Sequence, residues 1–369
     1  MHELGVRPGE PPDAAGTAAT GTTDNSAPAP VAGSAGRALK VTIRALQAGP
    51  VVILVLLIVV LSLLSDVFLT LGNAGNVMKQ SAVISILALG QLLVILTRGI
   101  DLSVGATLSL SAVVGSMVWR DQRSAALSVA AMLATGLAVG IVNGLLYVKG
   151  RLPHPFIATL AMLSVASGLA LYLSHSQTIQ GAAGVVDAIG SGRLSWIPGA
   201  GDFGWFPVAT LVVVGVALLV MVMLRWLVWG RWVYAVGGSP EAAVRTGIPV
   251  QSVLISVYVL SGLAAGTAAL LMVGKGNAGS PTSGALAELD AIAAVIIGGA
   301  SFLGGRGGVG NAITGALIIA VMRNGLNLLG IDPNWQFIAT GAILVAAVEL
   351  DVVRAHLERR FRSIQAVSG

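Results

Sequence analysis

The chain contains no cysteine and few charged residues, and each shortage narrows the chemistry open to it. Without cysteine there is no disulfide, no thiolate nucleophile and no cysteine-ligated metal. Charged residues make up only 10% of the 369 residues, against about 25% in a typical soluble domain. The four histidines lie far apart, without the spacing of metal ligands. We therefore expect no catalytic residue, no metal site and no cofactor on this chain, and we expect that it is not an enzyme.

Apolar residues dominate instead. They make up 55% of the sequence, and the mean hydropathy is +0.88. Successive apolar runs, most of them near the roughly 20 residues that cross a bilayer, predict an all-α, polytopic transmembrane helical bundle of about ten spans, within a membrane domain at 50–351. The expected spans are 50–66, 80–97, 103–119, 125–147, 156–174, 207–227, 252–272, 290–303, 308–328 and 335–350.

The basic residues predict how the bundle is oriented. Ten crossings put both termini on the same side, and a cytoplasmic amino terminus places fifteen of the 21 Lys and Arg residues on the cytoplasmic side, as membrane topology favours. Residues 1 to about 36 are rich in Ala, Gly, Pro, Thr and Ser, so we expect a disordered cytoplasmic tail there. Arg37, Lys40 and Arg44 follow as an inner anchor before the first span, so that tail and anchor together cover residues 1–49. Residues 352–369 are predicted to form a basic cytoplasmic tail.

A short polar break interrupts the apolar runs at Thr97–Gly105. An unneeded charge so close to the end of a membrane helix would be costly, so the break requires an explanation. Asp101 could bind a hydroxyl group of a ligand, pair with Arg98, or cap the helix that follows. Capping or pairing is the simpler explanation, because an acidic residue at a helix start is favoured by the backbone dipole alone.

Four amide side chains join Asp101 as candidates for a substrate pathway. Amides inside a membrane either form hydrogen bonds between helices or line a polar route, and the sequence leaves both roles open. The four amides are Gln91, Asn143, Asn324 and Asn327.

A stripe of glycines at 136, 140 and 144 predicts close packing of one helix against a neighbour.

The inner loop at 230–248 carries the signals of a short helix capped at both ends. Ser239 can cap its start, Pro240 suits the first helical position and Glu241 favours the positive end of the dipole. Gly247 can end it. The helix could be a plain surface connection, but signals at both ends favour a docking helix for a cytoplasmic protein.

This loop and four further motifs, which occur along the chain in the family's order, resemble the permease subunits of bacterial ABC importers for ribose, xylose, galactose and similar monosaccharides. The similarity runs from about residue 50 to 350. The other motifs are GIDLSVG at 99–105, KGR at 149–151 with PFIATL at 155–160, LDAIAAV at 289–295 with glycines at 298 and 299, and NGLNLLG at 324–330.

The resemblance implies a permease in the bacterial cytoplasmic (inner) membrane that forms a translocation pathway by alternating access. Its partners would be a cytoplasmic ABC ATPase that holds ATP and Mg, an extracytoplasmic sugar-binding protein, a second permease copy or close relative, and the lipid bilayer, with no nucleic acid. Neither the sugar or polyol nor the choice between homodimer and heterodimer follows from the sequence. The residues that match the ATPase-coupling helix of the family are Gly237, Gly238, Glu241, Ala242, Ala243, Arg245 and Gly247.

The chain departs from the family pattern in places. Val244 followed by Arg245 shifts the usual basic residue by one helical position, about 100° around the axis. Asn311–Ala312 stands where Gly–Thr is common, and Arg323 stands where Asn is frequent.

An ion-coupled secondary transporter of a small polar solute is the alternative function. It would need titratable groups deep in the spans, and mid-span positions hold almost none. The glycines around Arg306 do not make a phosphate loop, because the chain has no GxxxxGK[ST] motif. Nucleotide hydrolysis must therefore come from another polypeptide.

Overall fold

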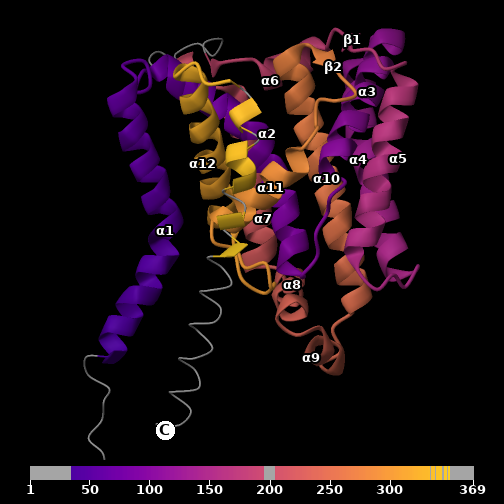
Figure 1. Ribbon diagram of the computed structural model, residues 1–369. Helices are drawn as coiled ribbons and strands as arrows, with labels where there is room; N and C mark the ends of the chain where they lie inside the picture. Colours follow the sequence, from indigo (N-terminus) through magenta and orange to yellow (C-terminus); the bar gives the residue numbers. More distant parts are fainter. Residues whose placement is uncertain are drawn as a thin grey trace, which may run out of the picture. The chain divides into compact units, whose positions relative to one another are not determined.

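The computed structural model describes residues 35–194, 204–332, 334–336, 338–342, 345–346 and 348–349, with side chains from Gly49 onward (Figure 1). The chain divides into residues 1–46 and residues 47–369. Helix α1 (Ala35–Leu64) crosses that boundary, and the elements after it pack within the second unit. They are α2 (Leu71–Leu96), α3 (Val104–Gln122), α4 (Ala125–Val148), α5 (Pro155–Leu173), β1 (Ile179–Gln180), α6 (Gly184–Gly190), α7 (Val208–Arg225), α8 (Val228–Gly238), α9 (Pro240–Arg245), α10 (Val250–Gly276), β2 (Ala278–Gly279), α11 (Ala287–Ile297) and α12 (Val309–Leu328).

Within the described residues, six helices are long and apolar enough to cross a membrane: α2, α4, α5, α7, α10 and α12. A shorter apolar helical stretch covers Gly49–Leu64. The helical, multi-pass membrane character predicted from the sequence is confirmed at this level. The last expected span is described only in pieces, all of them helical, and the tails at 1–34 and 352–369 lie outside the described residues.

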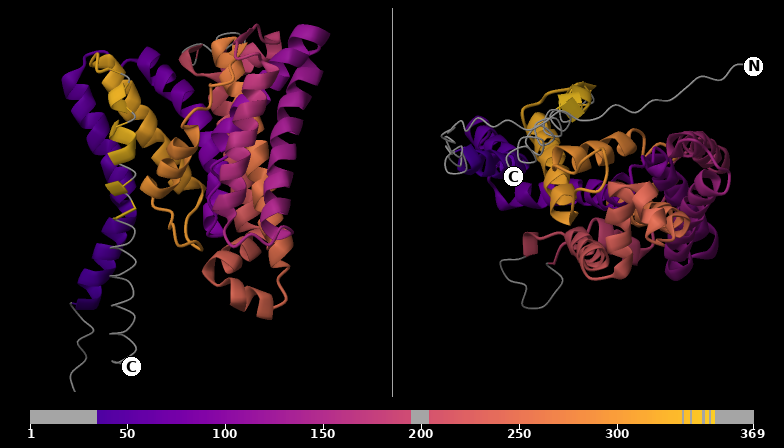
Figure 2. Two further views of the ribbon diagram at one scale, coloured as in Figure 1. Left: turned by 45° about the vertical axis from the view of Figure 1, so that its right-hand side comes forward. Right: turned by 90° about the horizontal axis from the view of Figure 1, so that it is seen from below.

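Helix α2 forms the centre of the bundle. Its most apolar window is 89% buried, whereas the same window of α7 is only 22% buried. α2 packs against α10, α12, α11 and α7, and α10 packs against α4. In Figure 2 the orange and yellow helices α11 and α12 lie on one side of α2, and the magenta α5 lies on the other.

The glycine stripe of α4 packs directly on α10. A Cβ added at Gly136 or Gly140 would meet the α10 backbone around Gly262 and Tyr258, and one added at Gly144 would meet Ile255. Helices associate in membranes by such close approach of small residues. The packing predicted for this stripe is confirmed.

The expected helix at 290–303 differs most from what the structure contains. α11 has 11 residues, so it is about 16 Å long at 1.5 Å per residue, near half of a hydrocarbon core of about 30 Å. The chain before it, from 277 to 286, is largely non-helical and runs alongside α3. The Gly284 N–H donates to Ser109 Oγ at 2.8 Å, and the Gly284 backbone touches that of Gly105.

The two ends of the bundle are marked by different elements. At one end β1 pairs with β2 in antiparallel register, with Ile179 opposite Gly279. At the other end α9 lies beyond the lower end of α8 in Figure 1. We name these the β1–β2 end and the α9 end.

Candidate functional site: a polar junction and a cavity

Asp101 lies buried in the non-helical break between α2 and α3, with 1% of its surface exposed. One carboxyl oxygen accepts hydrogen bonds from the Ser103 N–H at 3.0 Å and from Ser103 Oγ at 2.7 Å. The other accepts from Ser261 Oγ of α10 at 3.0 Å. The carboxyl group therefore ties the start of α3 to the middle of α10.

Two of the predicted amides belong to the same set of contacts. The Gln91 amide, oriented by its hydrogen bonds, accepts from the Asp101 N–H at 3.1 Å and donates to the Asp101 carbonyl at 3.2 Å. Asn143 Nδ2 of α4 donates to Ser103 Oγ at 2.8 Å. Gln91 and Asn143 are 0% and 1% exposed, so they join helices rather than line an open route. We name Gln91, Asp101, Ser103, Asn143 and Ser261 the Asp101 cluster.

Arg98 does not pair with Asp101 among the described contacts. Its Nε donates to the Gly237 carbonyl at 2.6 Å, and a terminal guanidinium nitrogen donates to the Gly238 carbonyl. Arg98 has φ 65°, a left-handed conformation that a non-glycine residue seldom adopts. The side chain is therefore aimed at the end of α8. Asp101 instead accepts a hydrogen bond from the backbone of Ser103, just before α3, and a role in binding a ligand hydroxyl stays a prediction.

Backbone contacts complete this region. The Gly305 N–H donates to the Leu96 carbonyl at 2.9 Å, and Tyr234 Oη donates to the Gly307 carbonyl at 2.8 Å. A Cβ at Gly237 would collide with the Leu96 carbonyl and approach the Gly305 nitrogen. Burial raises the pKa of Tyr234, so its hydroxyl remains a donor. We name Arg98, Tyr234, Gly237, Gly238, Gly305 and Gly307, with Leu96, the junction.

The predicted docking helix exists as α9, which has six residues. Ser239 Oγ accepts from the Ala242 N–H at 3.3 Å, Pro240 occupies the first turn, and Gly247 follows with φ 79°. Glu241, Ala242, Arg245 and Gly247 are exposed, while Ala243 is buried. Gly237 and Gly238 instead lie at the end of α8 and belong to the junction. A contact of the exposed residues with an ATPase remains a prediction.

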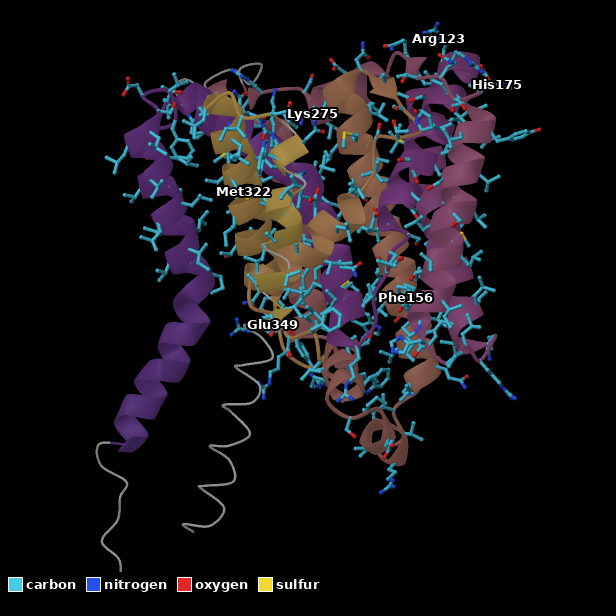
Figure 3. The ribbon with its side chains drawn as sticks, viewed as in Figure 1. Arg123, Phe156, His175, Lys275, Met322 and Glu349 are labelled. Carbon is cyan, nitrogen blue, oxygen red and sulfur yellow. The ribbon has the colours of Figure 1, made fainter. Side chains whose placement is uncertain are left out.

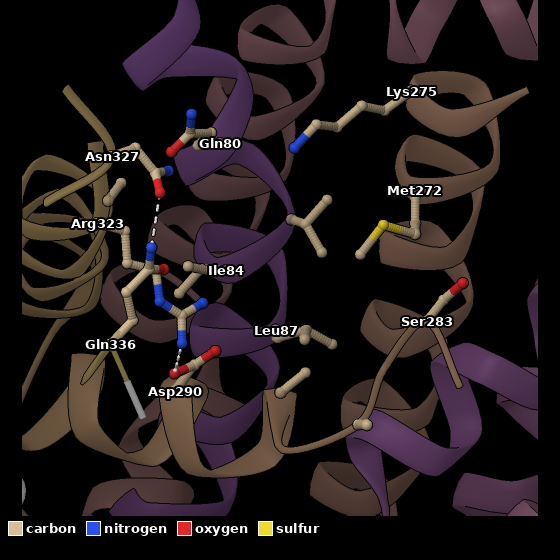
Figure 4. A pocket seen from close by; sticks show the side chains of 14 residues that line it. Gln80, Ile84, Leu87, Met272, Lys275, Ser283, Asp290, Arg323, Asn327 and Gln336 are labelled. Carbon is tan, nitrogen blue, oxygen red and sulfur yellow. Dashed lines mark hydrogen bonds and ion pairs between the residues drawn. The ribbon is translucent and has the colours of Figure 1, made fainter. Parts of the chain in front are cut away.

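A cavity of about 340 Å³ lies nearer the β1–β2 end, between α2, α10, α11 and α12 (Figure 4). The α2 residues that line it recur every three or four positions, which places them on one helical face. Half of the lining residues are polar or charged. The lining consists of Gln80, Val83, Ile84, Leu87, Met272, Lys275, Ser283, Ala285, Ala287, Asp290, Ala320, Arg323, Asn327 and Gln336.

An ion pair forms one wall of the cavity. Arg323 of α12 donates to Asp290 of α11 at 2.6 Å, and their side chains are 22% and 9% exposed. Arg323 Nε is buried and makes no hydrogen bond among the described residues. Asp290 is the fourth residue of α11. The ion pair with Arg323 of α12 is its main described side-chain contact.

Asn324 and Asn327 of α12 have different surroundings although they are three residues apart. Asn324 is 4% exposed and exchanges hydrogen bonds of 2.9 and 2.8 Å with Asn73 of α2. Asn327 lines the cavity, and its Oδ1 accepts from Gln336 Nε2 at 2.7 Å. Asn324 thus serves packing, and Asn327 is the predicted pathway residue that faces open space.

Sequence reasoning missed Gln80 and Lys275 as lining residues. Figure 4 shows Lys275 extending from α10 into the cavity, on the same side of the view as Gln80 and Asn327. The full set of side chains in Figure 3 shows Lys275 near the upper end of the bundle. The available signal was a polar residue recurring on one face of an apolar helix, as at Arg323 and Asn327 of α12.

Comparison with known proteins gives a consistent set of relatives. The family described as branched-chain amino acid transport system, permease component, matches residues 73–348. The ribose import permease protein RbsC of Escherichia coli strain K12 is 36% identical over 306 residues, covering 81% of this chain and 91% of RbsC. The fructose import permease protein FrcC of Rhizobium meliloti is 37% identical over 309 residues, covering 82% and 84%. The galactose/methyl galactoside import permease protein MglC of Salmonella typhimurium is 32% identical over 326 residues, covering 84% and 94%. No solved structure matches the chain.

Proposed function

The chain belongs to this family of ABC import permeases, and we propose that it is the membrane-spanning permease subunit of an ATP-driven, binding-protein-dependent monosaccharide importer. Its relatives are named as import permeases rather than as enzymes. In the proposal the protein resides in the bacterial cytoplasmic membrane. It works with a cytoplasmic ATPase, an extracytoplasmic sugar-binding protein and a second permease copy.

The junction is the observation that carries the proposal. Arg98 holds the carbonyls at the end of α8, and the Leu96 carbonyl accepts from Gly305. A displacement of α8 and α9 would therefore pull on the end of α2 and on the turn at 304–307 together. Asp101, at the centre of the Asp101 cluster, lies three residues after Arg98. A partner that moves α9 would in this way act on the packing of α3, α4 and α10.

Alternating access requires two states that the partners stabilise unequally, since equal affinity for both would shift nothing. In the proposal the exposed face of α9, with Glu241 and Arg245, supplies the contacts that change with the state of the ATPase. Movement then reaches the membrane helices through the hydrogen bonds of the junction. The permease itself breaks no covalent bond.

The cavity supports a solute pathway through this part of the bundle. Non-helical backbone at membrane depth is tolerated only where it is buried in protein or lines a wet cavity, and the segment before α11 contributes Ser283 and Ala285 to the cavity wall. Discontinuous helices form solute sites in other transporters. A volume of about 340 Å³ lies at the lower end of the range for small-molecule pockets, about 300–1,000 Å³, which suits a monosaccharide.

Reconstitution tests the proposal. Proteoliposomes would hold the purified permease, the ATPase subunit and the sugar-binding protein encoded with it, and uptake of labelled ribose, fructose and galactose would be measured with and without ATP on the cytoplasmic side. We expect uptake of at least one sugar that requires ATP, the ATPase and the binding protein. Uptake driven by a proton or sodium gradient without ATP would contradict the proposal.

One observation favours the ion-coupled alternative. Asp101 is a buried carboxyl, and Tyr258 Oη nearby has no hydrogen-bond partner among the described residues. However, both Asp101 oxygens already accept hydrogen bonds from serine donors. Those contacts account for the carboxyl group without a coupling ion, and the gradient arm of the reconstitution separates the two functions.

A further inference from the structure

The charge that lines the cavity exceeds what a neutral solute requires. Asp290 and Arg323 bind each other and offset their charges. Lys275 also lines the cavity, and among the described residues it makes neither an ion pair nor a hydrogen bond. Lys275 is the last residue but one of α10 and is exposed, so its ammonium group is accessible to a solute that enters the cavity. One unpaired positive charge therefore remains in the lining.

Among the described residues, the surroundings of Lys275 do not supply the missing negative charge. Lys79 of α2 lies within electrostatic range of Lys275 and of Arg193, and Asp187 is the acidic group near it. Lys79 Nζ donates to the Ser191 carbonyl at 2.5 Å, so it is held at the β1–β2 end of the cavity. The field at this end is therefore positive, and such a field attracts anions.

The remaining polar groups suit hydroxyls. Gln80, Asn327 and Gln336 offer amides that can both donate and accept, and Ser283 offers a hydroxyl. Asp290 has further lone pairs that can accept from a hydroxyl beside its bond to Arg323. Figure 4 shows Lys275, Gln80 and Asn327 toward one end of the cavity and Asp290 and Ser283 toward the other. A solute with hydroxyls along its length and one negative charge would match both ends.

We propose that the cavity binds a sugar acid, a polyhydroxylated solute with one carboxylate, and that Lys275 contacts the carboxylate while the amides, Asp290 and Arg323 contact the hydroxyls. The proposal rests on the proposed function, because it names the substrate class of the same permease. A sugar phosphate fits less well, since it would place up to about two negative charges against one unpaired ammonium group.

Direct binding to the purified full-length permease in lipid nanodiscs tests this inference. The probes are matched pairs that share the pyranose ring and differ only in the group at C6: D-galacturonate with D-galactose, and D-glucuronate with D-glucose. Isothermal titration would give Kd for each probe. We expect the acid of at least one pair to bind about tenfold more tightly than its neutral partner, a difference that corresponds to about 1.4 kcal/mol.

Lys275→Gln should reduce that preference to near one, because glutamine keeps hydrogen bonding but lacks the charge. Lys79→Gln is the matched control and should retain most of the preference, because Lys79 does not line the cavity. Lys275→Arg should preserve it, which guards against a folding defect in the glutamine variant. Raising salt from about 0.15 to 0.5 M should weaken acid binding more than sugar binding.

Three results would overturn the inference: neutral sugars binding as tightly as their acids in every pair, an acid preference that survives Lys275→Gln, or no acid binding up to millimolar concentrations. Tighter binding of galactose 6-phosphate than of galacturonate would also overturn the choice of a carboxylate. These measurements need neither ATP nor a partner subunit. Failure of these binding measurements leaves the proposed function intact, whereas gradient-driven uptake in the reconstitution would reject the proposed function and, with it, the assignment of a sugar acid as its substrate.

Discussion

The junction at the α9 end and the cavity toward the β1–β2 end are formed by different parts of the chain, backbone in one and side chains in the other. The junction consists largely of backbone: carbonyls of Leu96, Gly237 and Gly238 accept hydrogen bonds, and glycines allow the chains to touch. The cavity is defined by side chains from four helices. Contacts through the backbone fix where segments lie, whereas side chains fix which solute is bound. Changes at the junction should therefore affect transport of every substrate, and changes in the cavity should affect some substrates only.

The largest effect is expected at Asp101, beside the junction. Asp101→Ala removes the acceptor for the Ser103 N–H and for two serine hydroxyls, all within the bundle. Leaving a buried donor unpaired costs roughly 1–3 kcal/mol, so we expect ATP-driven uptake to be abolished for all sugars. Uptake in proteoliposomes should be normalised to assembled complex.

Asp101→Asn is the matched control, because it keeps the shape and one acceptor oxygen and should retain part of the uptake. Normal transport by assembled Asp101→Ala would show that the break at Thr97–Gly105 only separates two helices. The Asp101 cluster would then not be needed for transport.

The next effect sharpens the claim that the junction depends on backbone proximity. A methyl group at Gly237 would collide with the Leu96 carbonyl, whereas nothing lies within 4 Å of a Cβ at Gly238. We therefore expect Gly237→Ala to lower uptake more than about tenfold, since a bulky addition in a packed site costs about 1–3 kcal/mol, and Gly238→Ala to change it less than about twofold. Equal effects of the two substitutions on uptake would refute the steric argument.

Arg98 tests whether the junction transmits movement. Arg98→Asn removes both bonds to α8, while asparagine still tolerates the left-handed backbone. These charge-assisted hydrogen bonds are worth about 1.5–3 kcal/mol each. Their loss should therefore uncouple sugar uptake from ATP hydrolysis. We expect ATP hydrolysis to continue while uptake falls several-fold. An unchanged ratio of sugar transported to ATP hydrolysed would speak against a transmitting role.

The smallest effect is expected at Tyr234. Tyr234→Phe removes one hydrogen bond, to the Gly307 carbonyl at 2.8 Å, worth about 0.5–1.5 kcal/mol. We expect the midpoint of thermal unfolding to fall slightly and uptake to stay within about twofold. Because burial raises the pKa of Tyr234, the stabilisation from this bond should be complete below the unfolded tyrosine's pKa and be lost as the pH rises through the higher folded-state pKa. A difference between wild type and Tyr234→Phe that appears only near neutral pH would contradict this.

The same comparison explains which features the sequence could predict. The ends of α9 and the packing of Gly136 and Gly140 depend on residues close together in the chain, so local patterns predicted them. The cavity depends on residues from Gln80 to Gln336, which the fold alone brings together. The α11 helix was expected to be longer, because an apolar run does not reveal where a non-helical segment replaces a helix.

Asn324 and Asn327 show the limit most plainly. They are the same residue type on one helix, three residues apart. One bonds to Asn73 inside the bundle, and the other faces the cavity. Three residues rotate a side chain by about 300° around the axis, which is enough to change its surroundings. The positions of α2 and α11 decide which face of α12 packs against Asn73 and which face lines the cavity.

The shortness of α11 has a consequence for how the protein is made. With 11 residues and two carboxylates, Glu288 and Asp290, near its start, α11 is a poor candidate for independent insertion, because an acidic residue at the centre of a membrane helix costs about 2.5–3.5 kcal/mol. Its counterion, Arg323, is synthesised later, on α12. We therefore expect α11 and α12 to leave the ribosome-bound translocon as a hairpin, with α11 retained at the channel until Arg323 has emerged.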